Sequence, residues 1–532
     1  MLGRPEYGDS HGLHVGGVGH NDGVLLADLV QASHEVRSTR SRKAKTAALA
    51  AALGKAAPEE VETATSYLSG SLRQRRTGLG WRSLQSLPEP AGEPSLGVGE
   101  VHDTFEEMAG VAGAGSQARR AALADNLFGR ATRDEQQYLV GLVTGELRQG
   151  ALDGLMLEAV AAASGLPAAA VRRASMFAGS TPPVAAAAMT GGLAALEEFT
   201  LRPGRPVRPM LASSANTVEE AMAKAAPEGG EVAVDSKLDG IRVQVHKLGG
   251  EVHVYTRSLD EITDRVPEVA EAVAAVAART LVLDGEAIAL TPEGRARPFQ
   301  ETGARTASKL DVATLRERVP LTTYVFDLLH VDGDDLVDTP GRERFARLTE
   351  VLPPELVVPR TVTSDPAEAK RLFDDVVAAG HEGVVVKSLD VSYEAGRLGA
   401  GWVKVKPRHT LDLVVLAVEW GSGRRQGWLS NIHLGARDPE TGDFVMLGKT
   451  FKGMTDEMLE WQTKRFQELE TSRERHVVHV RPEQVVEIAF DGIQTSTRYP
   501  GGMALRFARV LRYRDDKTAD EADTIDLVRE LR

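Results

Sequence analysis

The apolar positions of residues 24–200 recur with the three-to-four-residue period of amphipathic helices. Segments such as 119–128 and 134–148 combine this period with abundant Ala, Leu, Glu and Arg, and alternating β-branched runs are almost absent. The pattern predicts an all-helical domain. Two stretches rich in Pro and Gly interrupt it, at 78–99 and 179–209, and the second is predicted to be an interdomain linker.

Beyond Met210 the pattern changes to short alternating runs bounded by turn residues, which predicts strands in an α+β, mostly antiparallel domain. The expected strands are 231–234, 241–246, 252–255, 281–283, 321–326, 384–387 and 402–405. A third, β-rich segment follows Pro407, with strands at 411–419, 432–435, 444–447, 484–490 and 506–513. It predicts a small β-barrel closed by a C-terminal helix at 521–531.

Length agrees with this division, because 532 residues at roughly 150 per domain predict about three domains. We expect a helical domain at 24–205, an α+β domain at 206–408 and the barrel at 409–532. Residues 1–23 are expected to be a disordered tail. The Gly- and His-rich start, residues 1–22, favours a floppy tail and leaves a metal-binding tract as the alternative.

Composition excludes several classes of chemistry. The chain contains no Cys, so disulfide frameworks, Cys-based zinc sites, iron–sulfur clusters and thiol nucleophiles are excluded. The formal net charge of −13 means that a bound polyanion must meet local basic surfaces. The sequence has no apolar stretch long enough to span a membrane and no signal-peptide core, so we expect a cytoplasmic protein without membrane association.

Lys237 lies between two alternating runs, in the segment Asp235-Ser-Lys237-Leu-Asp239-Gly240, and is predicted at a hairpin-like corner. An amine between two carboxylates, followed by a Gly that lets the backbone come close, suits a nucleophile aimed at a phosphate. An ordinary surface lysine in a turn is the alternative. Asp239 is expected to organise this turn, with general-base assistance to Lys237 as the sharper alternative.

A second cluster joins cations and carboxylates. The period of two places Lys404 and Lys406 on one face of a strand, where they would meet an anion or simply solvent. Glu286 and Glu382 each lie beside a Gly and are predicted at strand ends, where each could hold a hard divalent cation.

Two apparent phosphate-binding motifs fail on their spacing. Gly448-Lys449-Thr450 resembles the end of a P-loop, but Asp443 occupies the position of the first Gly. Gly421-Ser-Gly423 lacks the last Gly of a dinucleotide fingerprint, because Gln426 stands there. Both segments are expected to be barrel turns, the second with Arg424 and Arg425 available for a phosphate backbone.

The motifs together resemble the ordered motifs of the covalent nucleotidyltransferases, and most closely those of the ATP-dependent DNA ligases. The series is Lys237-x-Asp239-Gly240, Thr256-Arg257-Ser258, Asp284-Gly-Glu286, Tyr324-Val-Phe326-Asp327, Glu382-Gly383, Lys404-x-Lys406 and Arg512-x-Arg514-x-Asp516-Lys517. Further upstream, Gly145-Glu-Leu-Arg148-Gln149-Gly150 is similar to the ligase DNA-binding domain.

This resemblance implies an all-α DNA-binding domain, an α+β adenylyltransferase domain of the ATP-grasp-like nucleotidyltransferase type, and an OB-fold β-barrel. It implies ATP and Mg²⁺ as cofactors, with Lys237 covalently linked to AMP and metal held by Glu286 and Glu382. The implied ATP-binding residues are Asp235, Arg242, Arg257, Glu286, Phe326, Lys404, Lys406, Arg514 and Lys517. For Asp235, Arg242, Arg257 and Phe326 the alternatives are a turn carboxylate, two surface arginines and a core aromatic.

The implied function is sealing of nicks in duplex DNA, by a protein expected to act as a monomer in repair, replication or recombination. The AMP passes from Lys237 to the 5′-phosphate of the nick, and the 3′-hydroxyl then displaces it. The alternatives are an RNA-capping or RNA-ligase-type nucleotidyltransferase and a non-catalytic DNA-binding scaffold, and the absence of Cys argues against an NAD-dependent ligase. The chain departs from the pattern at Leu398, where a second Arg is common, and Arg397 is the candidate replacement.

Overall fold

The computed structural model describes residues 23–74, 76–147, 153–292, 294–308, 311–395, 398–422 and 425–531, so the expected tail at 1–22 lies outside the described residues. The chain divides into two compact units, each made of several stretches. The first unit comprises Met1–Leu211, Gly240–Val358 and Leu389–Gly399, and the second comprises Ala212–Asp239, Pro359–Ser388 and Ala400–Arg532. No helix in these described ranges is long and apolar enough to cross a membrane.

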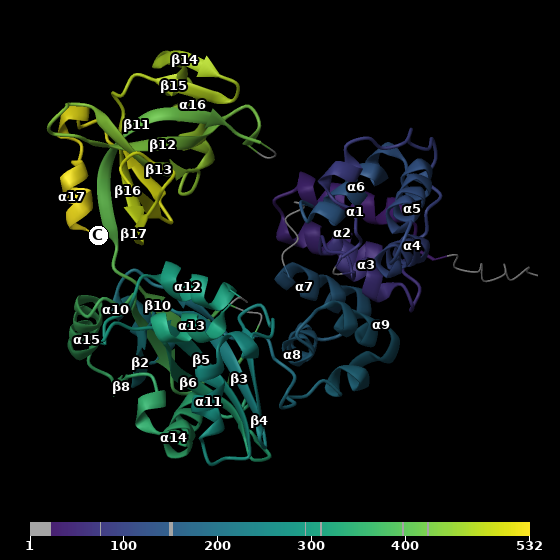
Figure 1. The fold of residues 1–532 in the computed structure, drawn as a ribbon, viewed down its shortest axis with the longest axis horizontal. Helices are drawn as coiled ribbons and strands as arrows, with labels where there is room; N and C mark the ends of the chain where they lie inside the picture. Colours follow the sequence, from purple (N-terminus) through teal and green to yellow (C-terminus); the bar gives the residue numbers. More distant parts are fainter. Residues whose placement is uncertain are drawn as a thin grey trace, which may run out of the picture. The chain divides into compact units, whose positions relative to one another are not determined.

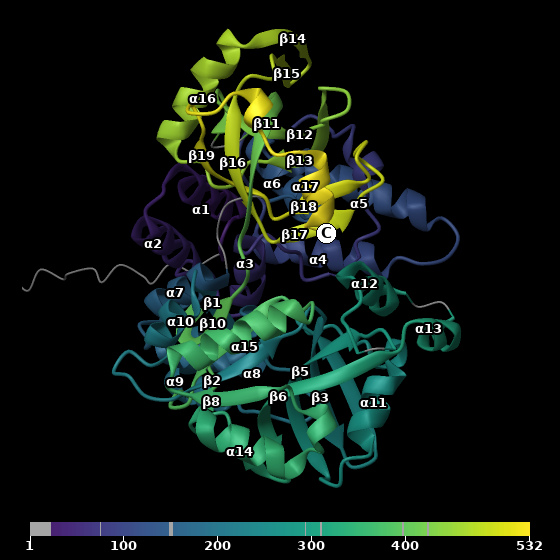
Figure 2. The ribbon, with the colours of Figure 1, turned by 90° about the vertical axis from the view of Figure 1, so that its left-hand side faces the viewer.

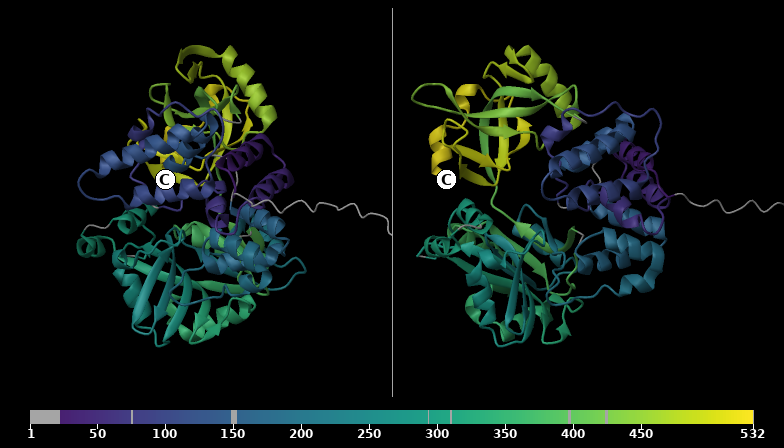
Figure 3. Two further views of the ribbon diagram at one scale, coloured as in Figure 1. Left: turned by 90° about the vertical axis from the view of Figure 1, so that its right-hand side faces the viewer. Right: turned by 45° about the vertical axis from the view of Figure 1, so that its right-hand side comes forward.

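The described part of residues 23–200 is helical, as its periodicity predicts (Figures 1 and 3). The α-helices are α1 (Leu26–Ser38), α2 (Arg42–Leu53), α3 (Val61–Leu68), α4 (Val98–Gly110), α5 (Ser116–Arg130), α6 (Arg133–Thr144), α7 (Asp153–Ser164), α8 (Ala168–Ala178) and α9 (Pro182–Glu197). Their apolar faces share one core, in which the Tyr138 hydroxyl donates a hydrogen bond of 2.8 Å to the backbone carbonyl of Tyr67.

Two helix boundaries correct the sequence analysis. The helix expected at 134–148 ends at Thr144, because Gly145 adopts a left-handed conformation (φ 68°) that terminates it. The expected linker at 179–209 contains the whole of α9. Pro182 and Pro183 stand at the first positions of this helix, where a missing N–H breaks no hydrogen bond, so prolines that suggested a linker begin a helix instead.

The first unit also contains an antiparallel sheet with the strand order β4-β3-β5-β6-β7. Its strands are β3 (Ile241–Leu248), β4 (Glu251–Thr256), β5 (Thr280–Ala289), β6 (Leu321–Val331) and β7 (Asp334–Asp335), and its helices are α11 (Pro267–Ala274), α12 (Phe299–Ala307), α13 (Val312–Arg318) and α14 (Gly341–Val351). Helices α11 and α14 pack on this sheet (Figure 2), and Val269 and Leu348 join Val243, Leu283 and Val325 in one core.

The second unit contains a sheet with the strand order β1-β10-β9-β2-β8. Its strands are β1 (Leu211–Ser214), β2 (Val232–Lys237), β8 (Arg360–Thr363), β9 (Gly383–Ser388) and β10 (Leu398–Val405), and its helices are α10 (Val218–Ala225) and α15 (Pro366–Ala378). Val234 and Val386 pack with Val403, Val405 and the two helices. The alternation around Lys404 is therefore as expected, with the valines buried.

The predicted hairpin at Lys237 is wrong. Strand β2 pairs with β8 and β9, whereas β3 pairs with β4 and β5, so the two strands belong to different sheets. Alternation identifies each strand but does not determine which strands pair. Both edges of β2 and both edges of β3 are paired with other strands, so β2 and β3 do not pair with each other. Gly240 is needed because a Cβ there would lie 2.4 Å from the carbonyl oxygen of Ala287.

The C-terminal part of the second unit is β-rich, as expected. Its elements are β11 (His409–Trp420), β12 (Leu429–Arg437), β13 (Phe444–Thr450), α16 (Asp456–Glu468), β14 (Glu470–Glu474), β15 (Val477–Val480), β16 (Val485–Phe490), β17 (Gly492–Thr495), β18 (Met503–Arg506), β19 (Arg509–Tyr513) and α17 (Ile525–Glu530). A register shift at residue 416 divides β11, which pairs with β16 through its first half and with β15 through its second. The same edge of β11 therefore pairs with two different strands, β16 and β15.

Two further expectations about this region are wrong. The strand predicted at 506–513 is two strands, because Phe507 adopts a left-handed conformation (φ 55°) that ends β18 before β19 begins. Gly448-Lys449-Thr450 lies within β13 and is not a turn, whereas Gly421 does follow the end of β11 in a loop. The C-terminal helix is present but shorter than predicted.

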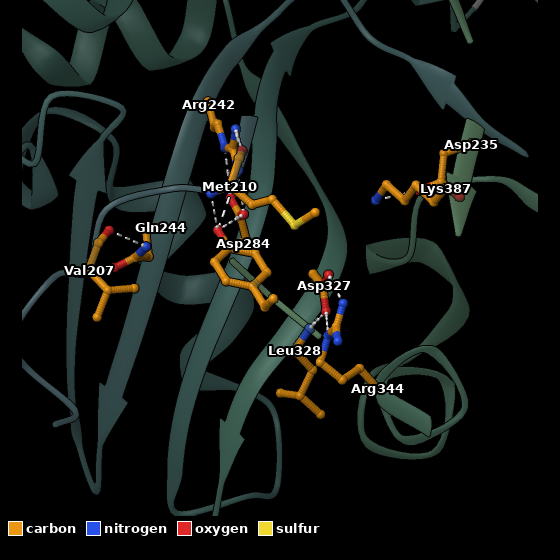
Figure 4. Close-up of polar contacts among 11 residues, drawn as sticks. Val207, Met210, Asp235, Arg242, Gln244, Asp284, Asp327, Leu328, Arg344 and Lys387 are labelled. Carbon is orange, nitrogen blue, oxygen red and sulfur yellow. Dashed lines mark hydrogen bonds and ion pairs between the residues drawn. The ribbon is translucent and has the colours of Figure 1, made fainter. Parts of the chain in front are cut away.

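A buried ion pair fixes α14 to β6 in the first unit (Figure 4). Arg344 Nε lies 2.8 Å from Asp327 Oδ1, and neither side chain is exposed to solvent. The remaining donor, Arg344 NH1, binds the backbone carbonyls of Thr339 and Val391. Every part of this guanidinium is thus matched to an acceptor, which is the condition under which a buried charge is tolerated.

We expect Arg344→Met to destabilise the first unit by about 3–5 kcal/mol, because it leaves the Asp327 carboxylate buried without its cation. Arg342→Met is the matched control. Arg342 pairs with Asp390 on the surface, with side chains 52% and 74% exposed, and its loss should cost about 0–1 kcal/mol. Urea unfolding followed by circular dichroism measures both, and similar midpoints for the two variants would contradict the prediction.

Candidate active site

Lys237 and Glu382 face each other at the ends of two neighbouring strands. Lys237 is the last residue of β2 and pairs with Gly383, the first residue of β9, so Glu382 directly precedes β9. The backbone N–H of Glu382 donates to the carbonyl of Lys237 at 3.1 Å. Their side chains form an ion pair between Lys237 Nζ and Glu382 Oε2. Strand register alone therefore brings together two groups 145 residues apart in sequence.

A second lysine completes the environment of Glu382. Lys406 Nζ lies 3.0 Å from Glu382 Oε1, so each carboxylate oxygen faces one ammonium group. Burial raises the pKa of Glu382, but Lys237 and then Lys406 outweigh it and lower that pKa to about 2. The side chain of Glu382 is 17% exposed, and its carboxylate stays ionised over the physiological range.

The backbone conformation and the packing at residue 383 explain why a Gly follows Glu382. Its φ of 126° suits only Gly, and a Cβ would lie 2.2 Å from the carbonyl oxygen of Val405 on β10. The close approach of β9 to β10 is what brings Lys406 beside Glu382. The Glu-Gly pair visible in the sequence thus reflects packing between two strands.

The C-terminal β-rich part contributes three residues to the same cluster, and sequence analysis identified none of them. Lys406 Nζ lies 3.4 Å from Asp491 Oδ2, and Arg506 NH1 lies 3.3 Å from Asp239 Oδ2. Arg509 approaches the other oxygen of Asp491 at 3.8 Å. Asp491 directly follows the last residue of β16. Arg506 is the last residue of β18, and Arg509 is the first residue of β19. Nothing in their local pattern links them to a lysine more than 250 residues earlier.

Asp239 is set apart from the other carboxylates by its pKa. Burial raises this pKa first, the neighbouring Glu382 carboxylate raises it further, and Arg506 opposes the rise. Two carboxyl groups so close compete for one proton. Asp239 is therefore the group of this pair that binds a proton more readily, and Glu382 is the one that remains charged.

Asp235 lies in the interior of the same sheet (Figure 4). Its carboxylate binds Arg360, at 2.5 Å from Nε and 2.7 Å from NH2, and Lys387 Nζ at 2.7 Å. Lys387 also lies 4.2 Å from the centre of the Trp402 ring. Burial raises the pKa of Asp235, yet Arg360 and Lys387 lower it overall. The expected contact of this carboxylate with adenine stays a prediction, and its visible partners are these two cations.

In the first unit, strand register aligns predicted residues across three strands. Arg242 on β3 pairs with Glu286 on β5, which pairs with Tyr324 on β6. Residues paired in an antiparallel sheet point to the same face, so these side chains form one row. Glu286 lies inside β5 and not at a strand end as predicted. The neighbouring Gly285 marks a register irregularity, where a Cβ would lie 2.6 Å from the carbonyl oxygen of Tyr324.

Arg242 is held in place by neighbours that the sequence does not reveal (Figure 4). Its Nε and NH2 lie 2.9 and 2.6 Å from the two oxygens of Asp284, and NH1 donates to the carbonyl of Met210 at 2.7 Å. The Tyr393 hydroxyl donates to Asp284 at 2.6 Å. The guanidinium lies 5.5 Å from the centre of the Phe326 ring. Arg242 is thus rigidly oriented beside an aromatic face.

Phe326 is half-buried, on the face opposite the core residue Val325. Asp284 pairs with Asp327 and Gly285 with Val325, so Phe326 is the extra residue of a β-bulge. Its partial burial disfavours the core-aromatic alternative, and its contact with adenine stays a prediction. Arg257 is exposed in the turn after β4.

Arg514 and Lys517 lie beside Asp412, near the strand β11. Their nitrogens NH1 and Nζ lie 2.8 and 2.7 Å from Asp412 Oδ2. Lys404 occupies β10, opposite Val385 of β9. Arg148, Arg397 and Arg424, singled out in the sequence analysis, lie outside the described residues. Among the described residues no group of three or more His, Asp or Glu side chains is arranged to hold a metal ion, and the metal roles of Glu286 and Glu382 stay predictions.

The helical region contains a cavity of about 620 Å³ beside Gly145. Residues of the loop between α3 and the turn at Trp81 line it, including Gly70, Arg76 and Gly78, together with the end of α6. Gly70, Gly78 and Gly145 all have positive φ. Among the described lining residues, Arg76 carries a positive charge and Ser71, Gln74 and Thr77 are polar.

Comparison with known proteins finds matches to family models along most of the chain. Family models described as "DNA ligase N terminus", "ATP dependent DNA ligase domain" and "ATP dependent DNA ligase C terminal region" match residues 82–161, 209–406 and 425–517. A protein described as "Probable DNA ligase" from Nocardioides sp. (strain ATCC BAA-499 / JS614) is 63% identical over 514 residues, which cover 96% of this chain and 99% of that protein.

A second "Probable DNA ligase", from Beutenbergia cavernae, is 64% identical over 516 residues, with 96% of this chain and 99% of that protein covered. A solved structure described as "Pmar-Lig_Pre." has a TM-score of 0.58 at 17% identity, covers 92% of this chain and 99% of its own, and shows likeness of fold alone. The chain belongs to the ATP-dependent DNA ligases. It is an enzyme that joins DNA using ATP, and neither the capping nor the scaffold alternative is favoured.

The low pKa of Glu382 predicts how acid affects the second unit. A lowered pKa means that the ionised carboxylate stabilises the fold above the ordinary glutamate pKa, and that this contribution disappears as the pH falls toward 2. Between pH 6 and pH 3 the wild-type protein should therefore lose more stability than Glu382→Gln, by at most about 3 kcal/mol. Urea midpoints measured across this range test the difference.

The exposed pair Glu460 and Lys464 offers a control, because the Glu460 side chain is 67% exposed. Glu460→Gln should follow the wild-type pH profile. Parallel profiles for wild-type protein and Glu382→Gln would show that Glu382 titrates as an ordinary carboxyl.

Proposed function

We propose that this ligase works through a covalent Lys237–AMP intermediate and seals nicks in duplex DNA. The observation that carries the proposal is the position of Lys237, at a strand end with its amine against Glu382 and with Lys406 on the other carboxylate oxygen. The ion pair with Glu382 orients the side chain of Lys237. An ordinary lysine in a surface turn has no such fixed partner. The family membership supports the same reaction.

In the first step the neutral amine of Lys237 attacks the α-phosphorus of ATP. The bond from this phosphorus to the bridging oxygen breaks, and pyrophosphate leaves in line with the attack. The AMP then passes to the 5′-phosphate of a nick, which frees Lys237. Finally the 3′-hydroxyl attacks the activated phosphate, and AMP leaves as the phosphodiester forms.

The carboxylates Glu286 and Glu382 would hold Mg²⁺, because carboxylate oxygens are its preferred protein ligands. The ion would supply charge neutralisation to the phosphates. Glu382 shares its charge with Lys237 and Lys406, so a cation held there would compete with both lysines for its carboxylate.

The remaining predicted residues have roles that suit their geometry. Phe326 would stack on adenine with its half-buried ring, and Arg242 and Arg257 would bind ribose or phosphate oxygens. Asp235 would support the adenine contact from within β2. Lys404 and Lys406 would offset charge on the transferring phosphate. Arg514 and Lys517 would orient the β- and γ-phosphates so that pyrophosphate departs in line.

We further propose three functional domains at 24–205, 206–408 and 409–532, with a disordered tail at 1–23. The family matches at 82–161, 209–406 and 425–517 support this order. The helical domain and an OB-fold barrel would grip a nicked duplex through its backbone, and the glycine-lined cavity beside Gly145 is suited to that contact. The enzyme would act in the cytoplasm as a monomer.

Lys237→Ala should abolish the labelled protein–AMP adduct formed from α-labelled ATP, and with it the sealing of a nicked duplex. Lys370→Ala, which removes a lysine paired with Asp374 on the surface of α15, should retain both activities. Parallel incubation with α-labelled GTP tests the nucleotide. A labelled adduct that persists in Lys237→Ala would show that another residue is the nucleophile.

The double variant Arg514→Ala/Lys517→Ala should lose Lys237 adenylylation by about 10² or more, since its role is to orient the leaving pyrophosphate. The same variant should still seal a nick that carries a pre-formed 5′-adenylate, because no pyrophosphate is involved there. If these cations contact the DNA backbone instead, adenylylation will be near normal and sealing of the pre-adenylated nick will fall, more steeply as salt rises.

A further inference from the structure

Asp412 is a nearly buried carboxylate that no part of the proposed mechanism uses. It lies on β11, and its side chain is 11% exposed. Its backbone is fixed at both ends by Asp523: the Asp412 N–H donates to Asp523 Oδ2 at 2.7 Å, and the Asp523 N–H donates to the carbonyl of Asp412 at 2.8 Å. This position is therefore held by the strand and by the segment before α17.

A single oxygen of Asp412 binds both cations assigned to the β- and γ-phosphates. Arg514 NH1 and Lys517 Nζ lie 2.8 and 2.7 Å from Oδ2. A turn in which the Lys517 N–H donates to the carbonyl of Arg514 at 3.2 Å brings the two side chains to the same side of the chain. The carboxylate thus holds the two cations as a pair at a common point.

Charge and burial both favour a lasting contact between Asp412 and the two cations. The other oxygen, Asp412 Oδ1, is buried and accepts no hydrogen bond from the part of the chain that the structure describes. If Arg514 and Lys517 moved away, the Asp412 carboxylate would lose both of its side-chain cations, which is unfavourable for a carboxylate at a largely buried strand position. The hydrogen bond to Asp412 also raises the pKa of Lys517, which keeps this ammonium charged. The three groups should therefore move and act together.

We propose that Asp412 is a positioning residue for the adenylylation step, which holds Arg514 and Lys517 in the geometry that receives the β- and γ-phosphates of ATP. The proposal rests on the function proposed above for these two cations. Asp412 itself touches no reacting atom. Asp516 binds Nε and NH2 of Arg514 at 2.8 and 2.7 Å, and Asp412 adds the one carboxylate oxygen that Arg514 and Lys517 share. This shared oxygen fixes the position of the two cations relative to each other, so that their separation need not be set when ATP binds.

Asp412→Asn keeps the size of the side chain and removes its charge. Single-turnover formation of Lys237–AMP from α-labelled ATP should slow by about tenfold or more, with a higher ATP concentration needed for half-maximal rate. Sealing of a pre-adenylated nick, measured without ATP, should change by less than about twofold. Glu487→Gln is the matched control, because Glu487 lies opposite Asp412 in register and binds Arg512 instead.

A combined variant separates positioning from a structural role. Adding Asp412→Asn to Arg514→Ala/Lys517→Ala should cause no further loss of adenylylation, because Asp412 acts only through these side chains. An additive loss, an equal fall in both activities of Asp412→Asn, or an unchanged rate would overturn the proposal. A faster rate would also overturn it, since it would show that Asp412 withholds the cations from ATP.

The variant Arg514→Ala/Lys517→Ala shows whether a negative result concerns the positioning role of Asp412 or the function proposed for the two cations. If Arg514→Ala/Lys517→Ala itself leaves adenylylation unchanged, the role assigned to the two cations is wrong, and the role of Asp412 falls with it. If the double variant is impaired and Asp412→Asn is not, only the positioning role is wrong.

Discussion

The geometry of the second unit depends on the placement of one carboxylate, Glu382, between two lysines. The register of β2 with β9 places Glu382 opposite Lys237, and the approach of β10, which only a Gly at 383 permits, adds Lys406. A buried anion is stable there only because two cations share it. The same arrangement holds the side chain of Lys237 in an ion pair with Glu382.

Carboxylates also hold the other cations to which the proposed function assigns phosphate binding. Arg242 is fixed by both oxygens of Asp284, and Arg514 and Lys517 share one oxygen of Asp412. A phosphate-binding cation that is already paired loses less freedom on binding its ligand, and this reduces the entropic cost of ordering it. The pairing also shows how a protein with a net charge of −13 holds basic side chains in fixed positions. Its acidic residues orient the basic ones.

The residues around Lys237 come from distant parts of the chain, and this has a consequence for the reaction cycle. Asp239 meets Arg506, and Lys406 meets Asp491, so residues of the C-terminal β-rich part neutralise charges beside the lysine. Such contacts are part-exposed and individually weak, and they can break without exposing an apolar core. The proposed mechanism has this region admit ATP at one stage and DNA at another, and contacts that break easily suit such a region.

Local pattern in the sequence predicts most of the elements and the order of the motifs: helices before residue 200, alternating strands after Met210, and Lys237, Glu382, Lys404 and Lys406 as candidate residues. These depend on local periodicity and residue type, which a sequence displays directly. It could not determine that β2 and β3 enter different sheets, that Pro182 begins a helix, or that Glu286 lies within a strand. It also could not find Asp284, Asp412, Asp491 or Arg506 as partners, because strand pairing and ion pairing join residues by distance in space. Only the tertiary structure decides which charges meet, since burial and register, not spacing along the chain, set the free energy of each pair.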